Sequence, residues 1–157
     1  MFRESRRAKQ NLDKEQCVKL LKEERRGVLG MLGDEDYPYA LPINFYYDEE
    51  ENKIYFHCGP KGHKMDAMKK HDKVSFTVWN QGIQKKDWSY YVDCVVIFGR
   101  VHFLEDRDVC REKIRDFGRK YIPTEDEMED ELNKHFAGAE VGCITIDHMS
   151  GKLVHEK

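Results

Sequence analysis

Hydrophobic and polar residues alternate along residues 37–47, a pattern typical of a β-strand. Five apolar or aromatic side chains occupy every second position and therefore share one face: Tyr39, Leu41, Ile43, Phe45 and Tyr47. Strand side chains point alternately to opposite faces, whereas helical side chains repeat about every 3.6 residues. A strongly polar turn follows at 48–52, and the aromatic segment 54–56 then predicts a second strand.

The same patterns predict the remaining elements. Asp13 followed by Gln16 is typical of a capping box, and it precedes a helical apolar stripe of Cys17, Leu20 and Leu21. Further helices are predicted over 63–70, 106–121 and 124–136, the last opened by a second capping box at Thr124. Further strands are predicted over 28–32, 74–79, 92–104 and 142–149, with a polar connection at 80–87 and a polar tail from 150.

About six strands joined by turns, without regular helical crossovers, favour a small antiparallel β-barrel with peripheral helices. The 157 residues are enough for one domain with a real core. We therefore expect a single domain over 1–157, with an N-terminal arm at 1–12 and the acidic helix, 124–137, inside the domain.

Composition excludes several classes of partner. The net charge is −3 and 36% of residues are charged, so there is no overall electrostatic case for binding nucleic acid or a membrane surface. No apolar run approaches the roughly 20 residues that span a bilayer, and no signal-peptide pattern follows the basic N-terminus. A cytoplasmic location is the default expectation. Five scattered cysteines without a CxxC pair predict free thiols and no metal site.

A glycine-bearing loop separates the strand at 54–56 from the helix at 63–70. It runs through Cys58-Gly59-Pro60-Lys61-Gly62 and leads to His63 and Lys64 at the start of the helix. The free amides of a helix N-terminus and a lysine together suit a phosphate group. On the residues alone, an ordinary solvated lysine is the slightly better interpretation. The spacing is not that of a Walker motif.

These features occur in an order that resembles the flavin-binding split-barrel superfamily, which includes pyridoxamine 5'-phosphate oxidase. Within it, the chain is most similar to the nitroimidazole-resistance (Nim) proteins. The resemblance rests on motifs spread over nearly the whole chain: Met1-Phe2-Arg3-Glu4, Arg6-Arg7, Gly33-Asp34, Tyr37-Pro38-Tyr39-Ala40, Pro42, Ile54-Tyr55-Phe56-His57, Gly62-His63-Lys64, Val95-Val96-Ile97-Phe98-Gly99-Arg100 and Ser150-Gly151-Lys152.

The resemblance implies a homodimeric split β-barrel that binds FMN in a groove at the subunit interface. It assigns the flavin phosphate to Gly62, His63 and Lys64. It gives His57 a phosphate, ribityl or substrate-side position and makes it a candidate catalytic residue, with a packed or surface strand histidine as the alternative. The strand positions that would pass beside the isoalloxazine ring are Pro42, Ile43, Asn44 and Phe45. Packing of Ile43 and Phe45 in the core is the alternative, and it is compatible with this position. Trp88, Tyr91 and Cys94 would approach the flavin from the partner subunit, with simple packing in the dimer core as the alternative for the aromatic residues.

For a Nim-like member, the implied activity is FMN-dependent reduction of a small nitroaromatic such as a nitroimidazole. Two alternatives stay open: a pyridoxamine-phosphate-oxidase-like enzyme, and a flavin-binding stress protein without specific turnover. The first would need a further cationic site for the substrate phosphate, and no C-terminal arginine-rich motif provides one. The sequence leaves the electron donor and the choice among FMN, another flavin and haem open.

Overall fold

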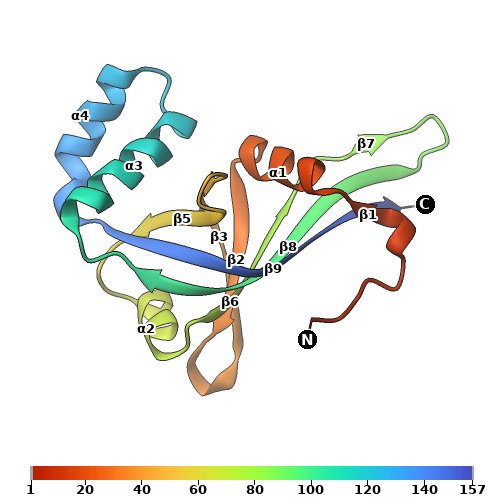
Figure 1. The fold of residues 1–157 in the computed structure, drawn as a ribbon, viewed down its shortest axis with the longest axis horizontal. Helices are drawn as coiled ribbons and strands as arrows, with labels where there is room; N and C mark the ends of the chain where they lie inside the picture. The colour runs from red at the N-terminus through yellow and green to blue at the C-terminus, as the bar shows by residue number, and fades with distance from the viewer. Residues whose placement is uncertain (1, 157) are drawn as a thin grey trace.

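The computed structural model describes residues 2–156 and shows one curled antiparallel sheet with helices around it (Figure 1). The predicted fold class, a mainly antiparallel split barrel with peripheral helices, is confirmed. The strands within the described residues are β1 (Asn11–Leu12), β2 (Arg26–Leu32), β3 (Pro38–Asn44), β4 (Tyr46–Asp48), β5 (Lys53–Cys58), β6 (Lys73–Trp79), β7 (Ile83–Gln84), β8 (Tyr90–Phe103) and β9 (Glu140–Glu156). The helices are α1 (Lys14–Glu23), α2 (His63–Lys70), α3 (Arg107–Tyr121) and α4 (Glu125–His135), with short 3-10 turns at Ala8–Gln10, Asp34–Asp36 and Phe136–Gly138.

The sheet follows the strand order β3-β2-β6-β8-β9-β5-β4, while β1 pairs with β9 and β7 with β8. The two ends of this path, β3 and β4, are consecutive in the chain and are separated by the single residue Phe45. The sheet must therefore curve until its two end strands meet at Phe45. This junction, Asn44-Phe45-Tyr46, is called the seam below.

The main core lies inside the curve of the sheet. Leu29, Phe76 and Ile97 are paired across β2, β6 and β8 and are fully buried. Helix α1 adds Cys17, Val18, Leu20 and Leu21 to this core, and α2 adds Met65, Ala67 and Met68. Burial of each large apolar side chain among these stabilises the fold by roughly 1.5–3 kcal/mol. A side chain at Gly151 would strike Cys17 Sγ at 2.3 Å, so this glycine permits the close approach of α1 to β9.

Helices α3 and α4 form a hairpin beside β5 and β9 (Figure 1). Beneath it lies a second apolar cluster that contains Tyr55, Cys110, Val141 and Cys143. Lys113 of α3 ties the hairpin to the β4–β5 turn through Asp48, at 3.0 Å, and Glu51. Lys113 and Asp48 are each 13% exposed, so this ion pair is largely shielded from water.

Most helix predictions are confirmed. The capping box of α1 is complete, since Asp13 and Gln16 each accept the other's backbone N–H, at 2.8 and 2.9 Å. Helix α2 has the predicted bounds, and Asp106 caps α3. The second capping box is incomplete. Thr124 accepts the Glu127 N–H, but the Glu127 carboxylate accepts the Thr124 hydroxyl at 2.8 Å and not the Thr124 backbone N–H.

The strand count of about six was too low, because the structure has nine strands within residues 2–156. The tail predicted from Ser150 is the second half of β9, which pairs with β8 as far as Glu156. The predicted polar connection contains β7, and the predicted N-terminal arm ends in β1. All five cysteines are free, as predicted. No helix within residues 2–156 is long and apolar enough to cross a membrane.

Candidate functional site

The loop before α2 forms an open, cationic cradle. Gly62 has a φ of 122°, a conformation that side-chain-bearing residues rarely adopt, and it precedes α2 without a side-chain cap. The first backbone hydrogen bond of the helix runs from Asp66 N–H to Gly62 C=O, which leaves the amides of the first turn free of helical partners. A Cβ at Gly59 or Gly62 would meet nothing within 4 Å, so the space above the loop is open.

Lys64 lies in the first turn of this helix. Its side chain is partly buried, yet its ammonium forms no hydrogen bond or ion pair with the residues that the structure describes. A partly buried cation beside free amides attracts an anion, because the helix dipole and the lysine act in the same direction. The residues present therefore fit a phosphate group.

The His63 side chain is turned toward the β2–β3 hairpin. Its ring stacks on Tyr39 with centroids 4.3 Å apart, and its Nε2 accepts the Asp34 N–H at 3.3 Å. The Asp34 carboxylate lies 3.6 Å from the same nitrogen. His63 thus braces the loop against the hairpin. Its free backbone N–H is the group it can offer to a phosphate.

His57 lies near the end of β5, on the outer surface of the sheet beneath α3. Its ring meets Phe117 edge-on, with centroids 4.8 Å apart. Surrounding protein atoms lower the pKa of His57, and the nearby positive charge of Lys64 lowers it further. Near neutral pH the ring is therefore uncharged, so it can both donate and accept a hydrogen bond. In sequence, His57 directly precedes the loop that leads to Lys64.

Strand β3 is an edge strand, since within residues 2–156 it pairs with β2 alone. Half of its backbone donors and acceptors therefore point away from the sheet. Pro42 and Asn44 are exposed and Ile43 is partly buried. These three positions leave a strand edge that a planar ligand with polar atoms along its rim can contact.

Phe45 differs from its three neighbours. Its ring is fully buried against Phe76, and its backbone N–H donates to the Tyr121 hydroxyl at 2.9 Å. Its carbonyl accepts from that hydroxyl at 2.6 Å and from Lys120 Nζ at 3.2 Å. Phe45 therefore has neither a free backbone group nor an exposed side chain to offer to a cofactor. In this structure its role is to join the two ends of the sheet.

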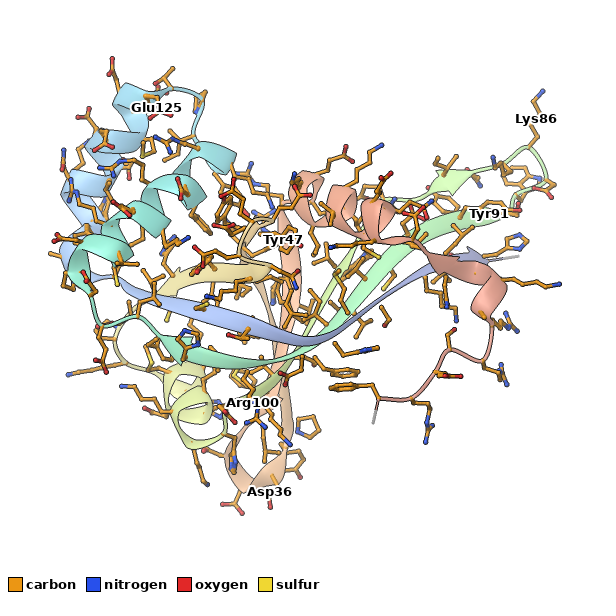
Figure 2. The ribbon with its side chains drawn as sticks, in the orientation of Figure 1. Asp36, Tyr47, Lys86, Tyr91, Arg100 and Glu125 are labelled. Atoms are coloured by element: carbon orange, nitrogen blue, oxygen red, sulfur yellow. The ribbon has the colours of Figure 1, made fainter. Side chains whose placement is uncertain are left out.

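Trp88, Tyr91 and Cys94 lie far from Lys64 within one chain. Figure 2 shows Tyr91 at the end of the β8–β9 arm, opposite α2. Trp88 is 83% exposed in the turn before β8, and Tyr91 stacks on His155 with centroids 4.4 Å apart. Cys94 is partly buried in the β6–β8 ladder opposite Trp79, and burial raises the pKa of its thiol. One chain does not bring these residues to the loop.

The outer face of the sheet carries apolar side chains at register positions around Cys94. Val28, Thr77 and Val96 are paired across β2, β6 and β8, and each is partly buried. Trp79 and Phe98 on the same strands are 48% and 43% exposed. This surface, called the outer apolar face below, resembles the apolar core of a subunit interface.

Sequence reasoning missed the residues that hold the seam. Lys120 donates to Leu21 C=O at 3.3 Å as well as to Phe45, and Tyr121 lies 2.7 Å from Arg25 C=O. Burial lowers the pKa of Lys120 to about 8. Tyr121 is the last residue of the helix predicted over 106–121, and no local pattern marked its hydroxyl as a partner for Phe45. Within the described residues, no group of three or more His, Cys, Asp or Glu side chains has the arrangement of a metal site.

Comparisons with solved structures agree with this architecture. The chain is similar to a candidate 5-nitroimidazole antibiotic resistance protein from Bacteroides thetaiotaomicron VPI-5482, with 21% identity, a TM-score of 0.78 and coverage of 92% of this chain and 87% of that one. It is similar to an FAD-binding protein from Mesorhizobium loti, with 22% identity, a TM-score of 0.63 and coverage of 92% and 96%. It also resembles the FAD and haem binding protein from Mycobacterium smegmatis, with 19% identity, a TM-score of 0.74 and coverage of 92% and 73%.

At these identities the structural likeness establishes the fold. No curated protein matches the chain. The family model described as pyridoxamine 5'-phosphate oxidase matches residues 13–153, which is most of the sequence. The chain therefore belongs to the pyridoxamine 5'-phosphate oxidase family of split-barrel flavin-binding proteins.

Proposed function

We propose that this protein binds a flavin nucleotide non-covalently, with the flavin phosphate in the cradle before α2 and the ring system along the free edge of β3. The observation that carries the proposal is the unpartnered, partly buried Lys64 beside the free amides of the α2 N-terminus. Lys64 would neutralise the phosphate, and the backbone amides of His63 and Lys64 would donate to its oxygens. His57, uncharged and adjacent, would add a hydrogen bond at the same end.

The complete site would need two copies of the chain. The exposed tryptophans Trp79 and Trp88 and the outer apolar face support a homodimer, because such a surface is costly to leave in water. In a dimer, Trp88, Tyr91 and Cys94 of one subunit would be available to cover the flavin of the other. A protein that sediments as a monomer and still binds flavin tightly would contradict this arrangement.

The reaction we propose is the reduction of a small nitroaromatic compound, such as a nitroimidazole. The flavin, when bound, supplies the electron transfer. The chain's own residues hold the phosphate, align the ring on β3 and shield the ring with aromatic side chains from the partner subunit. Support for this substrate class comes from the motif resemblance and from the nitroimidazole resistance protein among the structural neighbours.

Binding is tested with Lys64→Ala and two ligands, FMN and riboflavin. Because Lys64 is proposed to contact the phosphate, the variant should lose on the order of tenfold to a hundredfold in FMN affinity and little in riboflavin affinity. Lys70→Ala is the matched control, since Lys70 is an exposed lysine in the last turn of the same helix. Equal losses for the two ligands would remove Lys64 from the phosphate site.

Turnover separates the proposed enzyme from a flavin-binding protein without specific activity. Purified protein should show oxidised-flavin absorbance that survives gel filtration, and it should consume NADH or NADPH when a nitroimidazole is present. A flavin that stays oxidised with every donor would favour the binding protein. Oxidation of pyridoxamine phosphate would favour the oxidase alternative, and an intense Soret band would contradict flavin as the resident cofactor.

A further inference from the structure

An open hollow of about 630 Å³ lies between α1 and α3, beside β4 (Figure 1). It shares no lining residue with the cradle before α2. Lys120, in the last turn of α3, is partly buried and lines this hollow. The hollow therefore gives small molecules access to a lysine that protein atoms otherwise enclose.

The partners of the Lys120 amine suit its uncharged form. Nζ donates to Leu21 C=O at 3.3 Å and to Phe45 C=O at 3.2 Å, and within residues 2–156 it forms no ion pair with a carboxylate. An uncharged amine has two N–H groups and one lone pair, whereas an ammonium has three N–H groups and no acceptor. The two carbonyls thus satisfy both donors of the uncharged amine, and its lone pair is left without a partner among the described residues.

The surroundings of Lys120 keep a substantial fraction of its amine uncharged. Burial lowers its pKa to about 8; the carboxylate of Glu24 opposes this shift, and the positive charge of Arg25 adds to it. The rings of Phe45 and Tyr121, 3.9 and 5.6 Å from Nζ, offset only part of the cost of a buried charge. At about pH 7.5, roughly a quarter of Lys120 is therefore uncharged, against about one in a thousand for a lysine of ordinary pKa.

We propose that Lys120 is a covalent binding site for small, electrically neutral aldehydes, which enter through the hollow and form an imine with its amine. The nitrogen lone pair attacks the carbonyl carbon and a C–N bond forms, while a proton moves from nitrogen to the carbonyl oxygen. The C–O bond of this carbinolamine then breaks. The two amine hydrogens and the carbonyl oxygen leave as water, so the step needs no oxidant, reductant or other co-reactant. The inference is independent of flavin binding.

The charges around the hollow select against anionic aldehydes. The lining carries four carboxylates and two cations: Asp48, Glu49, Glu50, Asp116, Lys22 and Arg119. Lys22 is paired with Glu49 and Arg119 with Asp116, so the excess charge is negative. A surface of this sign repels anions and leaves a neutral carbonyl compound free to enter.

The experiment traps the imine on the full-length protein. Propanal with sodium cyanoborohydride converts each imine into a stable secondary amine, and peptide mass spectrometry follows modification at every lysine with time. Near neutral pH, Lys120 should react on the order of tenfold faster than Lys22, an exposed lysine that lines the same hollow. This factor is smaller than the difference in uncharged fraction, because partial burial slows approach to Lys120. A rate at Lys120 equal to or below that at Lys22 would overturn the inference.

The pH dependence tests the uncharged amine itself. The ratio of the Lys120 rate to that of exposed lysines should fall about tenfold between about pH 7 and pH 9, because ordinary lysines gain uncharged amine throughout this range whereas Lys120 approaches its limit. The neighbouring phenols of Tyr46 and Tyr121 stay uncharged there, since burial raises their pKa values. A ratio that does not change with pH would contradict attack by an uncharged Lys120.

Two controls separate the folded environment and the charge of the aldehyde. In denaturing urea the difference between Lys120 and Lys22 should vanish, and a preference that survives unfolding would overturn a site made by the fold. Glyoxylate is an anionic aldehyde. Relative to the exposed Lys86 at the far end of the β8 arm (Figure 2), it should label Lys120 roughly threefold less than propanal does, or lower still. An unchanged ratio would overturn the assignment to neutral aldehydes.

Discussion

Removal of the Tyr121 hydroxyl should weaken the protein at the seam. Phe45 lies between β3 and β4, so its backbone N–H has no strand partner and donates to Tyr121 Oη at 2.9 Å. In Tyr121→Phe this N–H is left without an acceptor beside a fully buried ring. The Phe45 carbonyl keeps its bond from Lys120 Nζ, so the N–H is the group that suffers most.

The cost follows mainly from that unsatisfied donor, because Arg25, whose carbonyl also contacts the Tyr121 hydroxyl, is exposed to water. A buried N–H without a partner costs about 1–3 kcal/mol, and we expect Tyr121→Phe to lower the free energy of unfolding by about 2 kcal/mol. For a chain of this length, that corresponds to a fall in Tm of roughly 4–8 °C. Urea denaturation followed by tryptophan fluorescence, together with calorimetry, measures both quantities.

Tyr46→Phe is the matched control for this substitution. Tyr46 is also partly buried and adjoins Phe45, but its hydroxyl forms no hydrogen bond with the residues described in the structure. Its loss should change stability by about 0.5 kcal/mol or less. A Tyr121→Phe protein as stable as wild type, or equal losses in the two variants, would refute the idea that the hydroxyl holds the seam.

Three further substitutions test other parts of the structure. Lys120 has a pKa of about 8 in the folded protein and about 10.5 when unfolded, so between these pH values the unfolded state holds more protons on this lysine. The stability of wild type relative to Lys120→Met, measured by denaturation, should therefore rise by up to a few kcal/mol from about pH 8 to about pH 10.5. Lys113 lowers the pKa of Glu51 to about 2, so wild type should lose stability relative to Glu51→Gln as pH falls from 4.5 toward 2. The loss should be about 1 kcal/mol or less, because Glu51 is partly exposed. A stability difference that does not change with pH would contradict the shifted pKa of Lys120 or of Glu51, whichever variant shows it. Val96→Asp places a charge on the outer apolar face and should shift sedimentation from the proposed dimer to a monomer. Thr145→Asp, at an exposed position of β9, should leave sedimentation unchanged.

The parts of the fold that depend on neighbours in sequence were predictable. The Asp13–Gln16 pair fixed the start of α1. The alternation of residues 39–47 identified extended chain on both sides of the seam, but the single strand that it predicted is broken at Phe45 into β3 and β4, which lie at the two ends of the strand order. The glycine loop and α2 were also predictable, because a Gly62 with a positive φ, a helix start and Lys64 are adjacent in the chain. Local sequence thus identified the cationic cradle of the candidate site.

The second half of β9 and the short strand β7 were missed for a different reason. Residues 150–156 mix polar and apolar side chains, because this part of the strand forms an arm with β8 and has no fully apolar face. Ile83 and Gln84 are exposed and become a strand because Tyr90 and Tyr91 lie opposite them. In both cases the strand is defined by its hydrogen-bonding partner, and the periodicity of the segment itself carries little signal.

The candidate site combines these two kinds of information. Its loop is local, but the course of β3 depends on contacts with α3, and Phe45 and Tyr121 are 76 residues apart in the chain. Because Tyr121 and Lys120 hold Phe45, α3 fixes the end of the strand that would run beside the flavin ring. Helix α3 is therefore the element through which stability at the seam and flavin affinity should be coupled.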